Sequence, residues 1–211
     1  MRSSTALALA VALVPGAACS SSAKKHPLSM QEMLAADPLP LSKGAKWTYD
    51  VKVKRFDPDS DKETTKTLSW TTEVLDVREG NGITAYRVKG WPGDLASFDQ
   101  AAPTPTERTI LRSNNNFLFG ATAEPSLDNA EGWFTWPLID GQKFCPKAQT
   151  VYCWQVAAVE TGYELSLFTG PDEQTFAIEP NTGVSRYHYA HHGTTNEVEA
   201  KLVSFEKGGK H

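Results

Sequence analysis

Hydrophobic and polar residues alternate strictly over residues 46–54. The apolar side chains occupy the odd positions, and polar side chains, three of them lysines, occupy the even positions. This period of two predicts a β-strand with one buried face and one face in solvent. The buried face of the predicted strand consists of Trp47, Tyr49, Val51 and Val53.

The residues that lead into this strand occur twice in the chain. The pattern Pro-Leu-x-x-Gly-x-Lys-aromatic spans residues 40–47 and returns at residues 137–144. A glycine between a proline and a strand is typical of a turn. We therefore predict one antiparallel β domain that is organised around two similar strand entries.

Short strand patterns and turn signals alternate through the rest of the chain. Residues 80–82, Gly-Asn-Gly, predict a hairpin turn, and residues 74–77 break the period of two, which predicts a β-bulge. Roughly ten short strands at a spacing of about 8–12 residues predict an all-β fold, either an antiparallel sandwich or a half-barrel. The irregular stretches 91–107 and 120–132 are predicted loops, which we expect to frame any ligand entrance.

The first 18 residues are predicted to be an export signal outside the fold. They contain Arg2 and then nine apolar residues, 6–14, whereas a helix that spans a bilayer core needs about 20. Residues 19–38 are rich in Ser, Ala, Lys and Pro and predict a flexible tether, with a two-turn helix at 28–36. Residues 39–211 are the predicted antiparallel β domain.

Cys19 follows the small residues Gly16, Ala17 and Ala18 at the end of this signal. The arrangement resembles the lipobox of bacterial lipoproteins, although Gly16 stands where Leu is commonest. The resemblance implies cleavage before Cys19 and acylation of its sulfur and its new amino terminus. Acyl chains would then hold the protein to the membrane. The alternative is ordinary cleavage after Ala18, which would release a soluble protein.

A broader resemblance covers most of residues 39–205. The two Pro-Leu-x-x-Gly entries and the motif Phe-Ala-x-x-Pro-x-x-Gly-Val-x-x-Tyr at residues 176–187 are similar to those of poorly characterised bacterial surface lipoproteins. This resemblance implies a β-rich envelope domain without a known reaction. Ser20, directly after the lipobox cysteine, resembles the residue of lipoproteins that are passed on to the outer membrane. By analogy with periplasmic lipoprotein carriers, a curved half-barrel can also hold acyl chains.

The other two cysteines, Cys145 and Cys153, are separated by seven residues. In an exported protein, such a close pair predicts a disulfide bond that closes a hairpin. The alternative is a redox-active pair, but the Cys-x-x-Cys spacing typical of that chemistry is absent.

The charge of the chain excludes one class of function. The formal net charge is −4, and it becomes −5 without the signal, because Lys+Arg falls from 21 to 20 while Asp+Glu stays at 25. A mildly acidic chain without a run of Lys or Arg has no electrostatic footprint for nucleic acid. We therefore expect a protein or a hydrophobic small molecule as partner, and no nucleic acid.

Aromatic side chains are the most suggestive content of the predicted domain. Ligand sites are concave and mostly apolar, often with aromatic walls, so a set of inward-facing rings can line a cavity. The same rings can instead fill a closed core, because each buries a large area. The candidate set consists of Trp47, Tyr49, Trp70, Tyr86 and Trp154.

Two patterns approach a metal site without completing it. Asp57, Asp59 and Asp61 have the spacing of a calcium loop, but Lys62 and Leu68 stand where Gly and Glu are needed. His188 and His192 share one strand face but lie about 13 Å apart at 3.3 Å per residue. We expect neither a metal nor another cofactor.

The sequence contains none of four common catalytic or phosphate-binding patterns: Gly-x-Ser-x-Gly, His-Glu-x-x-His, Gly-x-x-x-x-Gly-Lys and Gly-x-Gly-x-x-Gly. We therefore expect a membrane-tethered, non-enzymatic binding or interaction module of the bacterial envelope, located at the outer membrane. The alternatives are a carrier of lipid or another hydrophobic ligand, and a hydrolase of envelope polymers that would need two facing carboxylates.

Overall fold

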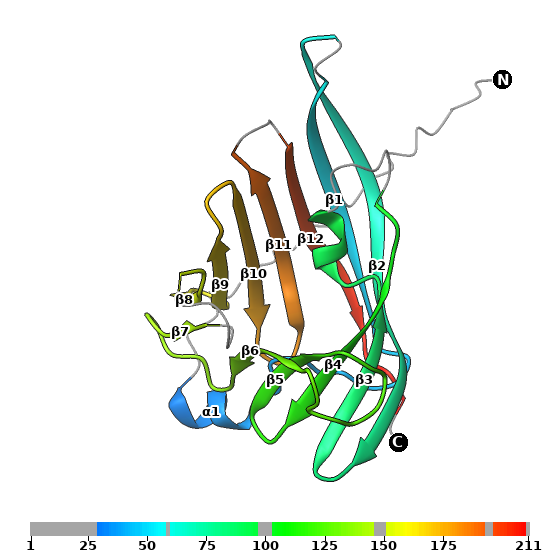
Figure 1. The fold of residues 1–211 in the computed structure, drawn as a ribbon, viewed down its shortest axis with the longest axis vertical. Helices are drawn as coiled ribbons and strands as arrows, with labels where there is room; N and C mark the ends of the chain where they lie inside the picture. The colour runs from blue at the N-terminus through cyan, green and yellow to red at the C-terminus, as the bar shows by residue number, and fades with distance from the viewer. Residues whose placement is uncertain (1–28, 58–59, 97–102, 146–150, 193–195, 210–211) are drawn as a thin grey trace, which may run out of the picture.

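The computed structural model describes residues 29–57, 60–96, 103–145, 151–192 and 196–209. These residues form the helix α1 (Met30–Ala35), the 3-10 helix η1 (Pro92–Ala96) and twelve strands (Figure 1). The strands are β1 (Lys46–Asp57), β2 (Lys62–Gly80), β3 (Ile83–Lys89), β4 (Glu107–Ser113), β5 (Asn116–Gly120), β6 (Glu131–Thr135), β7 (Lys143–Phe144), β8 (Trp154–Val159), β9 (Gly162–Phe168), β10 (Asp172–Glu179), β11 (Gly183–His191) and β12 (Asn196–Glu206).

All of these strands belong to one antiparallel sheet with the order β6-β5-β4-β3-β2-β1-β12-β11-β10-β9-β8-β7. The sheet curls into a nearly closed, barrel-like wall (Figure 1). The all-β antiparallel prediction is therefore confirmed. Of the two architectures that the sequence left open, the described residues form the curved single sheet and not the two packed sheets of a sandwich. The described residues contain twelve strands, where roughly ten were predicted.

The two Pro-Leu-x-x-Gly entries fold in the same way. Gly44 and Gly141 both have a positive φ, of 81° and 77°. Their N–H groups donate to the carbonyl oxygens of Val74 in β2 and Val156 in β8, at 2.8 and 2.9 Å. Each valine N–H donates back to the carbonyl of the residue that follows the glycine, at 3.0 and 2.9 Å. The repeated sequence pattern is thus a repeated structure, which begins the two halves β1–β6 and β7–β12.

The pairing of β1 with β12 joins these halves. Lys46 lies opposite Glu206, and the ladder continues to Arg55 opposite Asn196. At the other side of the barrel, no ladder joins β6 to β7 among the described residues. The sheet is therefore continuous through the middle of its strand order and has its two free edges at β6 and β7.

The alternation predicted for β1 is confirmed. Trp47, Tyr49 and Val51 are buried, and the polar residues between them are exposed or half-buried. Across the ladder, the ring of Trp47 stacks on Phe205 with centroids 4.8 Å apart. Since alternate residues of a strand face opposite sides of the sheet, the inner face of β1 supplies the centre of the hydrophobic core.

Two local predictions in the β2–β3 hairpin are also confirmed. The register between the strands shifts between Val74 and Asp76, as expected for a β-bulge. At the end of the hairpin, Asn81 and Gly82 both have positive φ, of 52° and 74°. Positive φ at both central residues defines the type I′ turn that an Asn-Gly pair favours.

Residues 29–38, which the sequence analysis assigned to the tether, include α1 and pack against the sheet. Ser29 caps α1 through reciprocal hydrogen bonds with Glu32, the two bonds of a capping box. Trp136 Nε1 donates to the carbonyl of Met33 at 3.0 Å, and Asp37 forms an ion pair with Arg112 at 3.3 Å. In Figure 1, α1 lies at the lower left, below β7.

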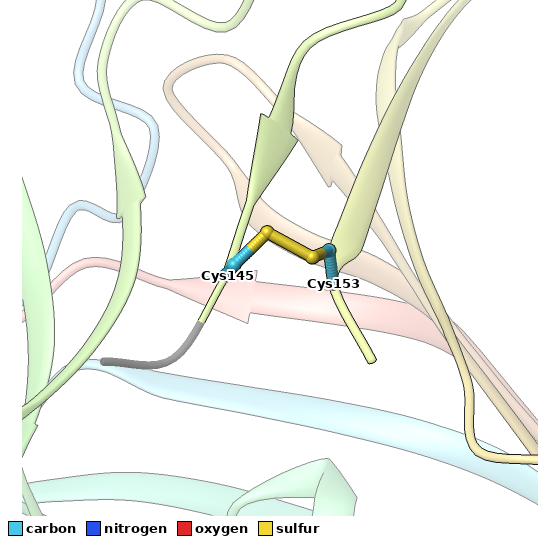
Figure 2. The surroundings of a disulfide bond; sticks show 2 residues. All are labelled: Cys145 and Cys153. Atoms are coloured by element: carbon cyan, nitrogen blue, oxygen red, sulfur yellow. A yellow bond between two sulfur atoms is a disulfide. The ribbon is translucent and has the colours of Figure 1, made fainter. Parts of the chain in front are cut away.

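A disulfide bond joins Cys145 to Cys153 (Figure 2). Cys145 directly follows β7 and Cys153 directly precedes β8, so the bond closes the connection between these paired strands. This is the arrangement that the close spacing of the two cysteines predicts.

We predict that replacing both cysteines with serine lowers the free energy of unfolding by about 2–3 kcal/mol, because the loop-entropy model assigns this much to a closed loop of about nine residues. Urea unfolding followed by tryptophan fluorescence measures the change. Cys19→Ser is the matched control and should leave the unfolding midpoint unchanged. An unaltered midpoint in the double variant would show that the bond does not stabilise the domain.

Two glycines provide a test of the turns that hold the sheet. Gly90 has a φ of +69°, and a Cβ at this position would lie 2.3 Å from the carbonyl oxygen of Thr71. Gly44 has a φ of +81° with no atom within 4 Å of its Cβ position. We expect Gly44→Ala to cost about 1–2 kcal/mol, the usual penalty for left-handed backbone, and Gly90→Ala to cost clearly more. Equal urea midpoints for the two variants would contradict this difference.

Candidate functional site

The described parts of the connection between β3 and β4, residues 90–96 and 103–106, form the centre of the candidate site. The two ends of the connection meet where Gly90 N–H donates to the carbonyl of Thr106 at 2.9 Å. Trp70 Nε1 and Thr72 Oγ1, both on β2, donate to the carbonyl of Gly90 at 2.8 and 2.6 Å. We call these bonded ends, Gly90 and Thr106, the anchored neck of the connection. Beyond the neck, η1 contacts β11 and β12, and Leu95 is fully buried.

Asp94 fixes η1 to the wall of the barrel. Its side chain is only 3% exposed and accepts hydrogen bonds from the N–H and the Oγ1 of Thr106, both at 2.8 Å. The guanidinium of Arg108 on β4 completes the ion pair. Burial of a carboxylate is costly unless it is paired and hydrogen-bonded, so these three contacts are what allow Asp94 to lie inside.

Trp91 lies at the centre of an aromatic cluster. Its ring meets Trp133 and Phe119 edge to face, with centroids 5.4 and 6.4 Å apart, and it stacks on Phe176 at 6.0 Å. Tyr187 contacts the ring of Phe176 at 4.8 Å. The cluster therefore joins the β3–β4 connection to β5, β6, β10 and β11.

Four buried polar atoms in this region have no hydrogen-bond partner among the described residues. They are Trp91 Nε1, Trp133 Nε1, Arg108 Nε and Tyr187 Oη. Three of the four can only donate, and the phenol of Tyr187 is held in its neutral, donating form because burial raises its pKa. An unsatisfied buried donor costs roughly 1–3 kcal/mol, so such a group is uncommon in a core without a functional reason.

The five aromatic residues predicted to line a cavity lie mainly in the packed core. Trp47, Tyr49, Trp70 and Tyr86 are buried, and the half-buried Trp154 packs against Phe176 at 5.7 Å. Tyr49 Oη donates to the carbonyl of Val184 at 2.9 Å, and Trp47 Nε1 donates to that of Thr182. The structure thus brings Trp154 to the cluster around Trp91, and the polar atoms of Trp47, Tyr49 and Trp70 bond to backbone carbonyls. A ligand cavity lined by these five residues remains a prediction.

A groove of about 660 Å³ lies on the outer face of β1, β2 and β12. Carboxylates and ammonium groups alternate along it, and Glu199 and Lys201 pair with each other at 3.0 Å. None of the five predicted aromatic residues lines this groove. Its charges are mixed and open to solvent, so it offers no concentrated field for a charged ligand.

The three neighbouring histidines each pair with a different carboxylate. His188 lies 3.3 Å from Glu197, His191 lies 2.7 Å from Asp172, and His192 lies 3.6 Å from Glu173. Over the described ranges, no group of three or more His, Cys, Asp or Glu side chains is placed to hold a metal ion. The carboxylate pattern at 57–61 falls partly outside the described residues.

Asp172 is the centre of a polar triad that the sequence analysis missed. Its carboxylate accepts hydrogen bonds from the Nδ1 of His191 and from the Oη of Tyr189. These bonds hold the pKa of Asp172 below its usual value, and burial together with Asp172 raises the pKa of Tyr189. The cross-strand register, which pairs Asp172 with His191, creates the triad, and register is not visible in either strand alone.

The proposed lipidation site, Cys19, lies outside the described residues, as does the predicted signal. Within the described part of the chain, the helices α1 and η1 are too short to cross a bilayer.

No protein-family model and no curated protein matches the chain. Among solved structures, one neighbour from Bacteroides fragilis NCTC 9343 is provisionally described as an exported protein with a YmcC-like fold. It is 12% identical, with a TM-score of 0.42 over 82% of this chain and 100% of that one. Another, from Parabacteroides distasonis ATCC 8503 and provisionally described as a lipoprotein, is 10% identical, with a TM-score of 0.37 over 81% and 99%. At these TM-scores the likeness carries no argument about function.

The lowered pKa of Asp172 predicts the pH dependence of Asp172→Asn. Because the folded state favours the carboxylate, its contribution to stability is complete above the unfolded pKa of about 3.9 and is lost as the pH falls through the folded value. We expect the variant to be less stable than the original at pH 7, with the difference closing towards pH 3. Urea unfolding across this range measures it, and the exposed Asp128→Asn serves as control. A difference that widens on acidification would contradict the assignment.

Proposed function

We propose that the chain is a lipoprotein of the bacterial envelope, tethered to the membrane at Cys19, whose β domain is a non-enzymatic binding or interaction module. The observation that carries the proposal is the distribution of the three cysteines. Two of them, Cys145 and Cys153, are consumed in a disulfide, which is typical of exported proteins. The third directly follows an apolar leader and three small residues, which is the position of a lipid acceptor.

The length of the tether limits how far the β domain can lie from the membrane. Nine residues lie between Cys19 and Ser29, which makes ten steps from one residue to the next, and an extended chain spans at most about 3.3–3.6 Å per step. Acylation of Cys19 therefore holds the start of α1 within roughly 35 Å of the bilayer surface. Stable anchoring requires two membrane-binding features, such as two acyl chains, and a triacylated cysteine carries three chains. Ser20 supports the outer membrane as the final location.

The interior of the barrel supports binding as the activity of the domain. The buried donors around Phe176 offer hydrogen bonds to an acceptor. The three imidazoles of residues 188–192 are each paired with a carboxylate. This distribution favours recognition of a partner over chemistry on it.

A carrier of a hydrophobic ligand is the second candidate function. The aromatic cluster around Trp91 and its unpaired donors favour this candidate, because ligand sites combine apolar walls with a few placed polar groups. Mass spectrometry of an organic extract of the purified chain distinguishes the two: a carrier would release a stoichiometric lipid, and an interaction module would not.

Replacement of the lipid acceptor tests the tether. We expect Cys19→Ser to move the protein from the membrane fraction to the soluble periplasmic fraction and to abolish labelling by radioactive palmitate. The variant in which Cys145 and Cys153 are both serine keeps the acceptor, and its folded fraction should stay with the membrane and keep the label. A Cys19→Ser protein that remained in the membrane fraction would refute the proposed attachment.

A further inference from the structure

The segment Trp91–Ala96 has the chemistry of a small amphipathic ligand. It places two apolar side chains, Trp91 and Leu95, deep in the barrel, and it places the carboxylate of Asp94 against Arg108. Within five consecutive residues, the chain thus presents an apolar body with an acidic head to the interior.

We propose that this segment occupies a binding site for a long-chain carboxylate, and that such a ligand enters by taking the place of the three side chains. The ligand's head group takes the place of the Asp94 carboxylate at Arg108, and its hydrocarbon chain takes the space of Trp91 and Leu95. The inference rests on the proposed binding function of the domain and specifies the class of its ligand.

Arg108 is the first reason for a carboxylate. Its terminal nitrogen binds Asp94, while its Nε is buried without a partner among the residues that the structure describes. A guanidinium and a carboxylate form their strongest contact as a bidentate pair through two parallel N–H groups. Asp94, held at the same time by Thr106, leaves this fork half used. A free carboxylate is not restrained by the backbone and can accept from both nitrogens.

The walls of the space are the second reason. Trp133 and Tyr187 are 1% and 0% exposed, and each has an unpaired donor. The rings of Trp133 and Tyr187 lie 5.5 and 4.8 Å from Phe176, and Arg108 lies 5.9 Å from the Phe119 centroid. The aromatic lining therefore fits an apolar chain, and the Arg108 cation beside it fits an acidic end.

The anchored neck allows the exchange without disturbing the sheet. The bonds of Trp70 and Thr72 to Gly90, and that of Gly90 to Thr106, all lie outside Trp91–Ala96. When the segment leaves, Arg108 exchanges one carboxylate for another, so no buried charge is left unpaired. Asp94 regains the solvation that it lacks inside the barrel.

The test uses the full-length chain with Cys19→Ser, which has no acyl chains of its own to compete. Isothermal titration calorimetry compares dodecanoate with dodecanol, the uncharged molecule of the same chain length. We expect dodecanoate to bind with a stoichiometry of one and at least tenfold more tightly than dodecanol. Absence of saturable dodecanoate binding, or equal affinity for both probes, overturns the proposal and identifies the cluster as a closed core.

Two substitutions assign the binding to this site. Asp94→Asn removes the charge that competes for Arg108 and should tighten dodecanoate binding tenfold or more, whereas Arg108→Gln should weaken it tenfold or more. The exposed Asp50→Asn on the outer face is the matched control and should change nothing. Dodecanoate affinity that responds in the same direction to both interior substitutions overturns the proposal.

A double variant protects the test against misfolding. If Arg108→Gln leaves the buried Asp94 unpaired and does not fold, Asp94→Asn combined with Arg108→Gln removes both charges. We expect this variant to bind dodecanoate and dodecanol equally, and a retained preference for dodecanoate contradicts the role of Arg108. The membrane fractionation of Cys19→Ser reports on the tether alone, so failure of ligand binding and failure of the envelope assignment are distinguishable.

Discussion

The pairing of the first strand with the last is the constraint on which the rest of the structure depends. β1 and β12 form a long antiparallel ladder from Lys46 opposite Glu206 to Arg55 opposite Asn196. Nearly the whole domain lies between these strands in the sequence, yet the ladder unites its two halves into one wall. The entropy of closing such a loop grows only slowly with its length, but contacts so distant in sequence form slowly. Completion of the core therefore awaits the pairing of β12 with β1.

Local chemistry made the individual elements of this wall predictable. The alternation around Trp47 predicted β1, the Asn81-Gly82 pair predicted the turn between β2 and β3, and the irregular stretch at 74–77 predicted the bulge in β2. These features are set by neighbours along the chain. The closure of one sheet, rather than the packing of two, depends on which distant strands pair, and a period of two is the same in both architectures. The sequence analysis assigned Glu131 and Gly132, the first two residues of β6, to the predicted loop 120–132, because that stretch lacks alternation.

The candidate site was less predictable than the fold. The sequence singled out inward-facing aromatic residues of the strands, and Trp47, Tyr49, Trp70 and Tyr86 are indeed buried. The cluster with unpaired donors instead centres on Trp91, which belongs to a connection without periodicity. The ion pair between Asp94 and Arg108 joins a residue of η1 to a residue of β4, and no spacing rule relates the two. A tryptophan and an aspartate close together in an irregular stretch are the only signal, and it is a weak one.

The order of the strands has a consequence for where the chain can begin. The N–H of Gly209, which follows β12, donates to the carbonyl of Lys43, which precedes β1. The residues just before the first strand and just after the last strand are therefore in contact. The free edges at β6 and β7 lie on the far side of the strand order. A circularly permuted gene that linked the residues after β12 to Ser29 and started between β6 and β7 would keep every strand ladder. The strand ladders alone therefore do not fix the point at which the chain path of the sheet starts.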